Sequence, residues 1–259
     1  MITPECNKSP EFRILHLYYD LMNLYGDWAN AEVLARELEA RGFSVTLEKK
    51  SAGHDVDFEI CDFVYIGSGT ERSQYACLRY ISEYKETILA RIEDGMHVLT
   101  TGNSHEMFGR FIRSAGGKTL EALGLLDFET VHENSRVTGD CVCKASFLEE
   151  KLIGFINKAG GTQRGNVERP FQLEMGPSGS ESSRAEGIIY KNLLGTYLTG
   201  PILVRNPPLL KHYADKLCKT SSTLHSPNSA LTSEYSEFAK FQKKAYQMAL
   251  KELEARKQT

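Results

Sequence analysis

The first 110 residues alternate between short apolar runs and segments with helical periodicity. The apolar runs predict four strands at Arg13–Tyr19, Phe43–Lys49, Asp62–Ile66 and Val98–Thr101. Helices are predicted after the first, third and fourth of these strands, over 28–41, Ser73–Asp94 and His105–Ser114. Strands and helices that alternate in this order form a parallel sheet with right-handed crossovers. The sequence therefore predicts an α/β fold.

The first of these helices has signals at both of its ends. Asp27 is a residue type favoured at the N-cap, and Gly42 tolerates the positive φ that commonly ends a helix. Between them, apolar side chains recur at helical spacing at Trp28, Ala31, Leu34, Ala35 and Leu38. This pattern predicts a helix with one buried face.

The pattern changes after about residue 120. Strand-like segments follow one another without a long helix between them, at Phe128–Val131, Arg136–Ala145, Ile153–Asn157 and Gly187–Tyr190. These segments predict antiparallel strands added at one edge of the sheet. Thr162–Ser183 is rich in Gly, Ser, Arg and Glu, and a surface loop is predicted there.

The C-terminal part divides the chain into three predicted regions. Residues 1–219 form the main domain and end in a helix at Pro207–Cys218, 220–233 is a polar linker, and 234–259 is an amphipathic helix. The apolar face of that helix carries Tyr235, Phe238, Ala245, Tyr246, Ala249, Leu250 and Leu253. The helix either packs on its own domain or docks on a partner.

Composition narrows the classes of function. The chain has 259 residues and a formal net charge of −3, which gives no basic footprint for nucleic acid. No apolar run is long enough to span a bilayer, and 1–10 lacks the apolar core of a signal peptide, so we predict a cytoplasmic protein.

The six cysteines are scattered along the chain. Cys141 and Cys143 are predicted to share one face of a strand, but no second Cys or His pair has zinc-ligand spacing. Reduced thiols in or near the core are therefore expected, with no metal and no cofactor. His16 and Cys77 are likewise interpreted as packed core groups.

Two loops follow the ends of predicted strands, where open α/β sheets bind ligands. One is Gly67-Ser68-Gly69, whose glycines would let backbone N–H groups approach an anion closely. The other is Val98–Arg110, where a short strand passes through a tight turn into a predicted helix. This is the geometry of a nucleophile elbow, in which the residue at the apex is exposed and strained.

The elbow resembles that of the class I, triad-type glutamine amidotransferases. Their pattern is hydrophobic-Cys-Gly-Gly-aromatic-Gln-x-hydrophobic-Gly. Aligned with this chain, it puts Gly102 at the cysteine, Asn103 and Ser104 at the two glycines, and Glu106 at the glutamine. Gly109 and the apolar residues are retained. The resemblance thus implies the elbow without its nucleophile.

Further blocks resemble one branch of that family, at Met22–Asp27, Tyr65–Arg72, Gly124–Phe128, Ser135–Asp140 and Gly187–Leu203. The branch contains the cobyric acid synthases and the small (GatD-type) subunit of lipid II isoglutaminyl synthase. The resemblance implies a flavodoxin-like, three-layer fold with a mostly parallel central sheet and antiparallel edge strands. It also implies glutamine hydrolysis that supplies ammonia to a Mur-ligase-like (MurT-type) synthetase.

The resemblance places a second substitution at Thr199, where the family has the histidine that deprotonates the cysteine. Glycine has no nucleophile, and threonine is no base near neutral pH. We therefore predict no competent catalytic pair. Ser104 remains as an alternative nucleophile, although a serine in the first turn of a helix more often caps it, and the adjacent His105 would point away from it.

The predicted ligand-binding residues are Gly67, Ser68, Gly69, Asn103, Glu106 and Arg136. By resemblance, Arg136 lies near the glutamine pocket, where a guanidinium can bind a carboxylate through two hydrogen bonds; the alternative is a surface arginine. Three hypotheses follow. The chain is a degenerate binding or scaffold subunit for a Mur-ligase-like synthetase, an active glutaminase or hydrolase with a relocated nucleophile, or a sensor of glutamine or a glutamate-like molecule.

Overall fold

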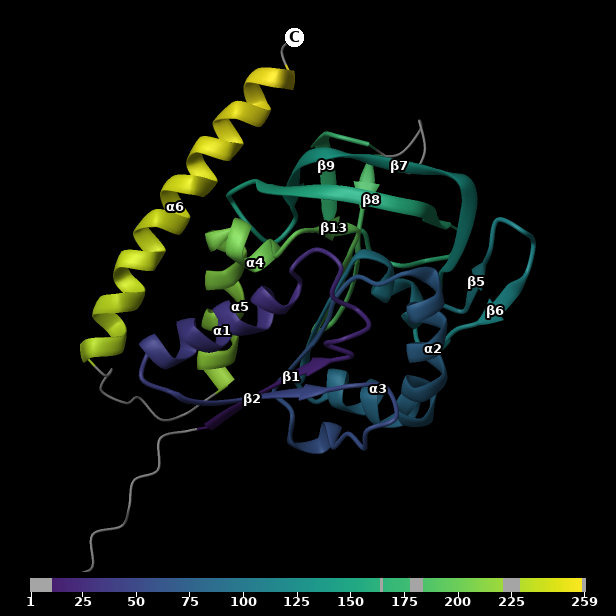
Figure 1. Ribbon diagram of the computed structural model, residues 1–259, viewed down its shortest axis with the longest axis horizontal. Helices are drawn as coiled ribbons and strands as arrows, with labels where there is room; N and C mark the ends of the chain where they lie inside the picture. Colours follow the sequence, from purple (N-terminus) through teal and green to yellow (C-terminus); the bar gives the residue numbers. More distant parts are fainter. Residues whose placement is uncertain (1–10, 164, 178–183, 221–228, 258–259) are drawn as a thin grey trace, which may run out of the picture.

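The computed structural model describes residues 11–163, 165–177, 184–220 and 229–257, and its central sheet is mostly parallel (Figure 1). Five strands run parallel, in the order β12-β4-β3-β1-β2, and β11 pairs antiparallel with β12 at the edge. Their bounds are β1 (Glu11–Leu17), β2 (Ser44–Lys50), β3 (Phe63–Ile66), β4 (His97–Thr101), β11 (Ile188–Tyr190) and β12 (Leu193–Thr196). The predicted α/β fold with a mostly parallel central sheet is confirmed.

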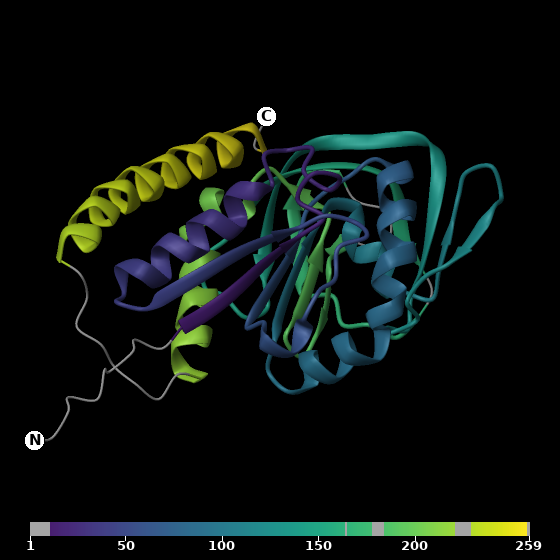
Figure 2. The same ribbon diagram turned by 60° about the horizontal axis from the view of Figure 1, so that its bottom comes forward.

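Helices cover both faces of this sheet (Figure 2). Alternate residues of each strand face opposite cores, so Ile14 packs toward α1 and α5 whereas Leu15 packs toward α2 and α3. The helices are α1 (Trp28–Ala40), α2 (Glu71–Ile81), α3 (Lys85–Glu93), α4 (Ile202–Arg205) and α5 (Pro207–Thr220), with short 3-10 segments η1 (Phe58–Ile60) and η2 (Ser82–Tyr84).

A second sheet lies beside the central one, and it contains most of the antiparallel strands. A long two-stranded ribbon forms its middle, in which β7 pairs antiparallel with β8 and is irregular between His132 and Val137. The strands are β5 (Phe111–Arg113), β6 (Thr119–Glu121), β7 (Glu129–Ala145), β8 (Leu152–Gln163), β9 (Phe171–Met175), β10 (Ala185–Glu186) and β13 (Leu198–Thr199). These strands therefore pair mainly with each other, and among the described strands β11 is the one added antiparallel at an edge of the central sheet.

One predicted helix and one predicted loop differ from the structure in this part of the fold. The long helix Ser73–Asp94 is interrupted at η2, where the Ser82 hydroxyl donates to the Arg79 carbonyl at 2.8 Å; such local bonds compete with the helix. The predicted loop Thr162–Ser183 contains β9, because Phe171 and Leu173 alternate into the core. Residues 164 and 178–183 of that segment lie outside the described residues.

The C-terminal helix packs on its own domain. Helix α6 (Ser229–Lys257) begins inside the predicted linker 220–233, where Ala230 and Leu231 favour helix; 221–228 lie outside the described residues. Tyr246 and Leu253 are buried against Val142 and Ile153 of the second sheet. Phe241 and Met248 are 70% and 63% exposed, so the apolar surface of the helix is only partly covered.

The thiols of the described residues are unpaired and mainly packed inside. Cys61, Cys77, Cys141 and Cys143 are buried, Cys218 is half-buried, and Cys6 lies outside the described residues. Cys141 and Cys143 share the inner face of β7, as predicted. Within the described ranges no helix is long and apolar enough to cross a bilayer, and no group of three His, Cys, Asp or Glu side chains could hold a metal.

Four histidines make the fold sensitive to acid. Burial lowers the pKa to about 4 for His16, His97, His105 and His212. The unfolded chain binds protons below about pH 6.5, whereas these folded groups resist protonation until about pH 4, so stability is lost as the pH falls through that window.

We expect His16→Leu to reduce this loss, because both ring nitrogens of His16 are buried without a hydrogen-bond partner among the described residues. Urea titrations between about pH 4 and 7 should give a shallower slope for the variant, by up to about 1.4 kcal/mol per pH unit. Above that range both chains have neutral histidines, so their difference in stability should become constant. An unchanged slope would show that His16 is protonated equally in both states.

Candidate functional site

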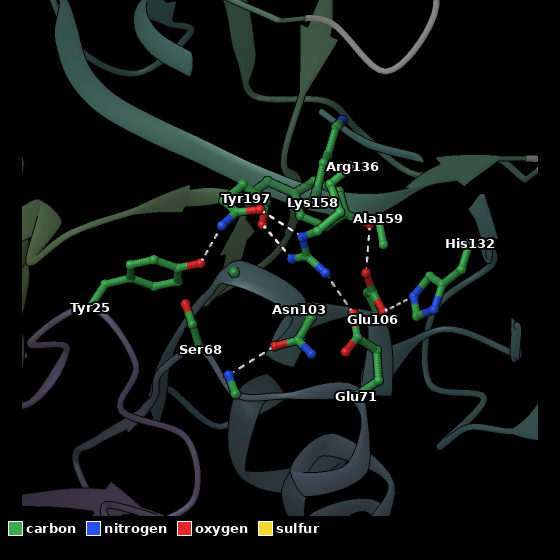
Figure 3. Close-up of a pocket in the computed structure, with 13 residues that line it drawn as sticks. Tyr25, Ser68, Glu71, Asn103, Glu106, His132, Arg136, Lys158, Ala159 and Tyr197 are labelled. Atoms are coloured by element: carbon green, nitrogen blue, oxygen red, sulfur yellow. Dashed lines mark hydrogen bonds and ion pairs between the residues drawn. The ribbon is translucent and has the colours of Figure 1, made fainter. Parts of the chain in front are cut away.

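A small polar pocket lies where the C-terminal edge of the central sheet meets the β7–β8 ribbon (Figure 3). The cavity is about 20 Å³, room for about one water molecule. It is lined by Tyr25, Ser68, Gly69, Glu71, Gly102, Asn103, Glu106, His132, Arg136, Asn157, Lys158, Ala159 and Tyr197. Of the predicted residues, Ser68, Gly69, Asn103, Glu106 and Arg136 line it beside Gly102. Gly67, Ser104 and Thr199 do not.

The elbow after β4 turns more tightly than predicted. A 3-10 segment, η3 (Gly102–Phe108), follows the strand directly, and β5 begins at Phe111, so the predicted helix His105–Ser114 is wrong. The chain turns there because Gly109 packs on Phe128: a Cβ on Gly109 would lie 2.7 Å from the Phe128 ring. This close approach ends the helical segment after two turns.

The apex of the elbow keeps the backbone geometry of a nucleophile position but has no side chain. Gly102 has φ +62°, the left-handed conformation that favours glycine. A Cβ on Gly102 would lie 2.1 Å from Ser68 Oγ and 2.7 Å from Ser68 Cβ. Ser68 therefore occupies the space into which a side chain at the apex would project.

Thr199 is bonded to the second sheet. Its hydroxyl donates to the Phe155 carbonyl at 2.8 Å, and the residue is 1% exposed on β13. The hydroxyl thus links β13 to β8, and it is not presented to the cavity.

Ser104 is also buried and bonded. Its hydroxyl lies 2.8 Å from the Thr101 carbonyl and 3.0 Å from the Ile66 carbonyl, and the residue is 0% exposed. A hydroxyl hydrogen shared between two carbonyls joins the elbow to the end of β3, whereas a capping serine would accept a backbone N–H. The adjacent His105 contacts the Gly102 carbonyl through Nδ1 at 2.8 Å.

The two glycine-containing loops are joined by Asn103, whose side-chain oxygen accepts the Gly69 N–H at 3.0 Å (Figure 3). Gly67 lies behind them against the loop after β1. A Cβ there would lie 2.3 Å from the Met22 carbonyl and 2.6 Å from Asp27 Cβ. The glycine at 67 therefore allows close backbone packing, and it does not face the cavity.

Asp27 holds the first of these loops. Its carboxylate accepts the Ser68 N–H at 2.9 Å, and burial raises its pKa. The predicted capping bond is absent: Asp27 makes no side-chain cap, and the Trp28 N–H donates to Asn23 Oδ1 at 2.9 Å instead. The Asp27 carboxylate therefore binds the Gly67–Gly69 loop, and the Asn23 side chain caps the N-terminus of α1.

Glu106 is the centre of a buried polar network. Its carboxylate accepts hydrogen bonds from Gln74 Nε2 at 2.7 Å, His132 Nε2 at 2.9 Å and the Tyr197 hydroxyl at 2.8 Å. Only 1% of the residue is exposed. Burial alone would lower the pKa of His132, but the hydrogen bond and charge of Glu106 outweigh it and raise that pKa. The network joins α2, the elbow, β7 and the residue between β12 and β13.

Arg136 points into the mouth of the pocket, where this chain supplies its partners. Its NH1 group pairs with Glu71 Oε1 at 2.8 Å (Figure 3). Its Nε donates to Asn157 Oδ1 at 2.8 Å. Asn157 also donates to the Tyr25 hydroxyl at 2.8 Å. The guanidinium predicted to bind a ligand carboxylate therefore binds the chain's own carboxylate in this structure.

Sequence reasoning missed the remaining lining residues, Tyr25, Glu71, His132, Asn157, Lys158, Ala159 and Tyr197. Tyr25, Glu71 and Tyr197 lie inside the sequence blocks that resemble the family, so their position near the two loops could have been predicted. His132 and the residues of β8 are brought in by the register of the β7–β8 ribbon, for which the sequence has no local signal.

Comparisons with known proteins identify the family. The model of the CobB/CobQ-like glutamine amidotransferase domain matches residues 13–207. The GatD subunit of lipid II isoglutaminyl synthase (glutamine-hydrolyzing) from Staphylococcus aureus is 33% identical over 209 residues, which are 81% of this chain and 85% of that protein. The corresponding subunit from Streptococcus pneumoniae is 32% identical over 201 residues, covering 77% of each.

A solved structure agrees on the fold. The crystal structure of a glutamine amidotransferase from Thermotoga maritima superposes with a TM-score of 0.51 at 17% identity, over 93% of this chain and 97% of that one. The family match covers the elbow, the Gly67–Gly69 loop and the strand that carries Thr199. This chain therefore belongs to the CobB/CobQ-like glutamine amidotransferase family.

Proposed function

We propose that this chain is the amidotransferase-type subunit of a two-subunit enzyme and that it no longer hydrolyses glutamine by the thiol mechanism of its family. Its partner would be a Mur-ligase-like synthetase that acts on lipid II. The similarity to two GatD subunits of lipid II isoglutaminyl synthase supports this assignment. In the complex the chain acts by binding its partner.

The observation that carries the proposal is the exclusion of a side chain from the elbow. The family nucleophile position is Gly102, and Ser68 Oγ lies within 2.1 Å of where a Cβ would be. At the family base position, Thr199 uses its hydroxyl to hold the Phe155 carbonyl. Neither position offers a group that could attack an amide or accept a proton near pH 7.

The pocket itself also favours a binding role over catalysis. Its volume of about 20 Å³ leaves no room for glutamine while Glu71 pairs with Arg136. The alternative nucleophile, Ser104, is buried and bonded to two carbonyls outside the lining. No contact in the described structure favours the hydrolase alternative over a binding subunit.

The test is a glutaminase assay on the purified full-length chain, alone and with the Mur-ligase-like synthetase of the same organism. We expect no glutamate release above a blank, and we expect the two proteins to elute together from a sizing column. Glutamate release that disappears in Ser104→Ala would establish the relocated serine instead. Release that survives Ser104→Ala, or the absence of a complex, would also contradict the proposal.

A further inference from the structure

A second cavity, of about 140 Å³, opens beside the C-terminal ends of β1 and β2. It lies between the loop after β2 and the end of α2 with η2, and it shares no lining residue with the first pocket. Its walls include the aromatic side chains of Tyr18, Phe58, Tyr80 and Tyr84, with Glu83 at the rim. No part of the proposed subunit function uses it.

The backbone at Tyr18 is strained. Tyr18 has φ 58°, a left-handed conformation that is a genuine outlier for a bulky residue. Its N–H donates to the Lys50 carbonyl at 2.6 Å, and its carbonyl accepts from Met22 N at 2.8 Å, so the surrounding chain holds the strain. Strain of this kind concentrates at functional positions.

The Tyr18 side chain is nearly enclosed, yet its hydroxyl is unused. The residue is 3% exposed, and within the described part of the chain its hydroxyl has no hydrogen-bond partner. The hydroxyl keeps access to the cavity that Tyr18 lines, so it is available to a hydrogen-bonding group of a ligand.

The other rings are fixed around the cavity. Phe58 and Tyr84 pack edge to face with ring centroids 5.3 Å apart, and the Tyr84 hydroxyl accepts the Val56 N–H at 3.3 Å. The Tyr80 ring lies over Gly53, where an added Cβ would be 3.5 Å from the ring. The rings are thus held by contacts with the loop, which keeps the cavity formed without a ligand.

The charges around the cavity favour a cation. Asp55 and Glu83 are exposed at its rim, and their carboxylates form no ion pair or hydrogen bond with any described residue. Burial raises the pKa of Tyr18, and the nearby Glu83 raises it further. Lys50 is the neighbouring cation: its Nζ pairs with Glu48 at 2.9 Å and also feels the charge of Asp55, so Glu83 is the rim carboxylate that lies apart from it. Aromatic faces with an unpaired carboxylate are the combination that attracts ammonium groups.

We propose that this cavity binds an alkylammonium group. The ammonium would lie against the rings of Tyr80 and Tyr84, between the Tyr18 hydroxyl and the Glu83 carboxylate. The alkyl stem would lie along Leu17, Val56 and Phe58, and Gly53 and His54 also line the cavity. A lysine side chain and a free primary amine share this chemistry.

The first test titrates the full-length chain with n-butylammonium and with butan-1-ol, its neutral counterpart, by calorimetry and NMR. We expect the cation to bind about threefold to tenfold more tightly, the range of a cation–π contact with partial desolvation. A third titration with Nα-acetyl-lysine amide separates the sources. Tighter binding than n-butylammonium assigns the cavity to a lysine side chain, and weaker binding assigns it to a free amine. Equal affinity for the cation and the alcohol, or no binding of either cation, overturns the proposal.

Variants then test the walls. Tyr80→Leu and Glu83→Gln should each weaken n-butylammonium binding by about threefold to tenfold, whereas Tyr80→Phe, which keeps the ring, should retain it. Glu86→Gln is the matched control, because Glu86 is an exposed glutamate close in sequence that does not line the cavity. Both wall residues are exposed, so the variants should fold, which circular dichroism checks. Unchanged affinity in Tyr80→Leu and Glu83→Gln would overturn the proposal.

Discussion

Replacing Gly102 with alanine will lower the free energy of unfolding by about 2–4 kcal/mol, whereas in a chain that carries Ser68→Gly the same replacement will lower it by only about 1–2 kcal/mol. The smaller value is the strain of an L-residue at φ +62°. The remainder is the overlap with Ser68, which lies 2.1 Å from the position of the new Cβ. Urea denaturation of the four chains of this double-mutant cycle measures the coupling.

Gly117→Ala is the matched control for the strain alone. Gly117 has φ +83° and nothing within 4 Å of an added Cβ, and it does not line the pocket. Its replacement should therefore cost the same in both Ser68 backgrounds. If Gly102→Ala also costs the same in both, Ser68 does not fill the apex. The coupling has a practical meaning: an engineered cysteine at 102 needs Ser68→Gly beside it.

Glu106→Leu should destabilise the chain by about 3–5 kcal/mol, because it removes a carboxylate that accepts from three buried donors, of which Gln74 Nε2 retains only the Asn103 carbonyl. The donors are Gln74 Nε2, His132 Nε2 and the Tyr197 hydroxyl, each within 2.9 Å of the carboxylate. Leucine matches much of the volume of glutamate, so packing is largely kept. The change in the midpoint of urea denaturation gives the loss.

Glu93→Leu is the control for this experiment. Glu93 also accepts a tyrosine hydroxyl, from Tyr190 at 2.7 Å, and pairs with Lys191 at 3.2 Å, but these contacts are exposed. Its replacement should change stability by about 1 kcal/mol or less. Glu106→Gln adds a second readout: without the charge, the pKa of His132 followed by NMR should fall. A cost for Glu106→Leu as small as that for Glu93→Leu would contradict the buried network.

The sequence predicted the elements that depend on local periodicity. The strands β1, β2, β3, β4 and β11 of the central sheet appear within about two residues of their predicted ends, whereas β12 was not predicted. Consecutive residues such as Ile14 and Leu15 must both be apolar when helices cover both faces, which gives these strands their signal. The prediction of a helix at 105–114 was wrong, because the turn there is set by contact between Gly109 and Phe128, which are distant in sequence.

In the candidate site, too, the residues fixed by local sequence were predictable and those fixed by long-range contacts were not. The loop residues Ser68, Gly69 and Asn103 were predictable, since they follow strand ends that a parallel sheet brings together. The partners His132 and Asn157 were not, because they depend on the antiparallel register of β7 and β8 across an irregularity at 132–137. The pairing of Arg136 with Glu71 also escaped, since both residue types are common on solvated surfaces.

Helix α6 and the pocket share one structural support. The β7–β8 ribbon extends from the side of α2 toward α6 (Figure 1). It carries His132, Arg136 and Asn157 to the pocket, and its residues Val142 and Ile153 pack against α6. Displacing the helix would expose those two apolar side chains to water and remove the backing of the strands. A tag, a truncation or a bound protein that displaces α6 therefore perturbs the same two strands that form one wall of the pocket.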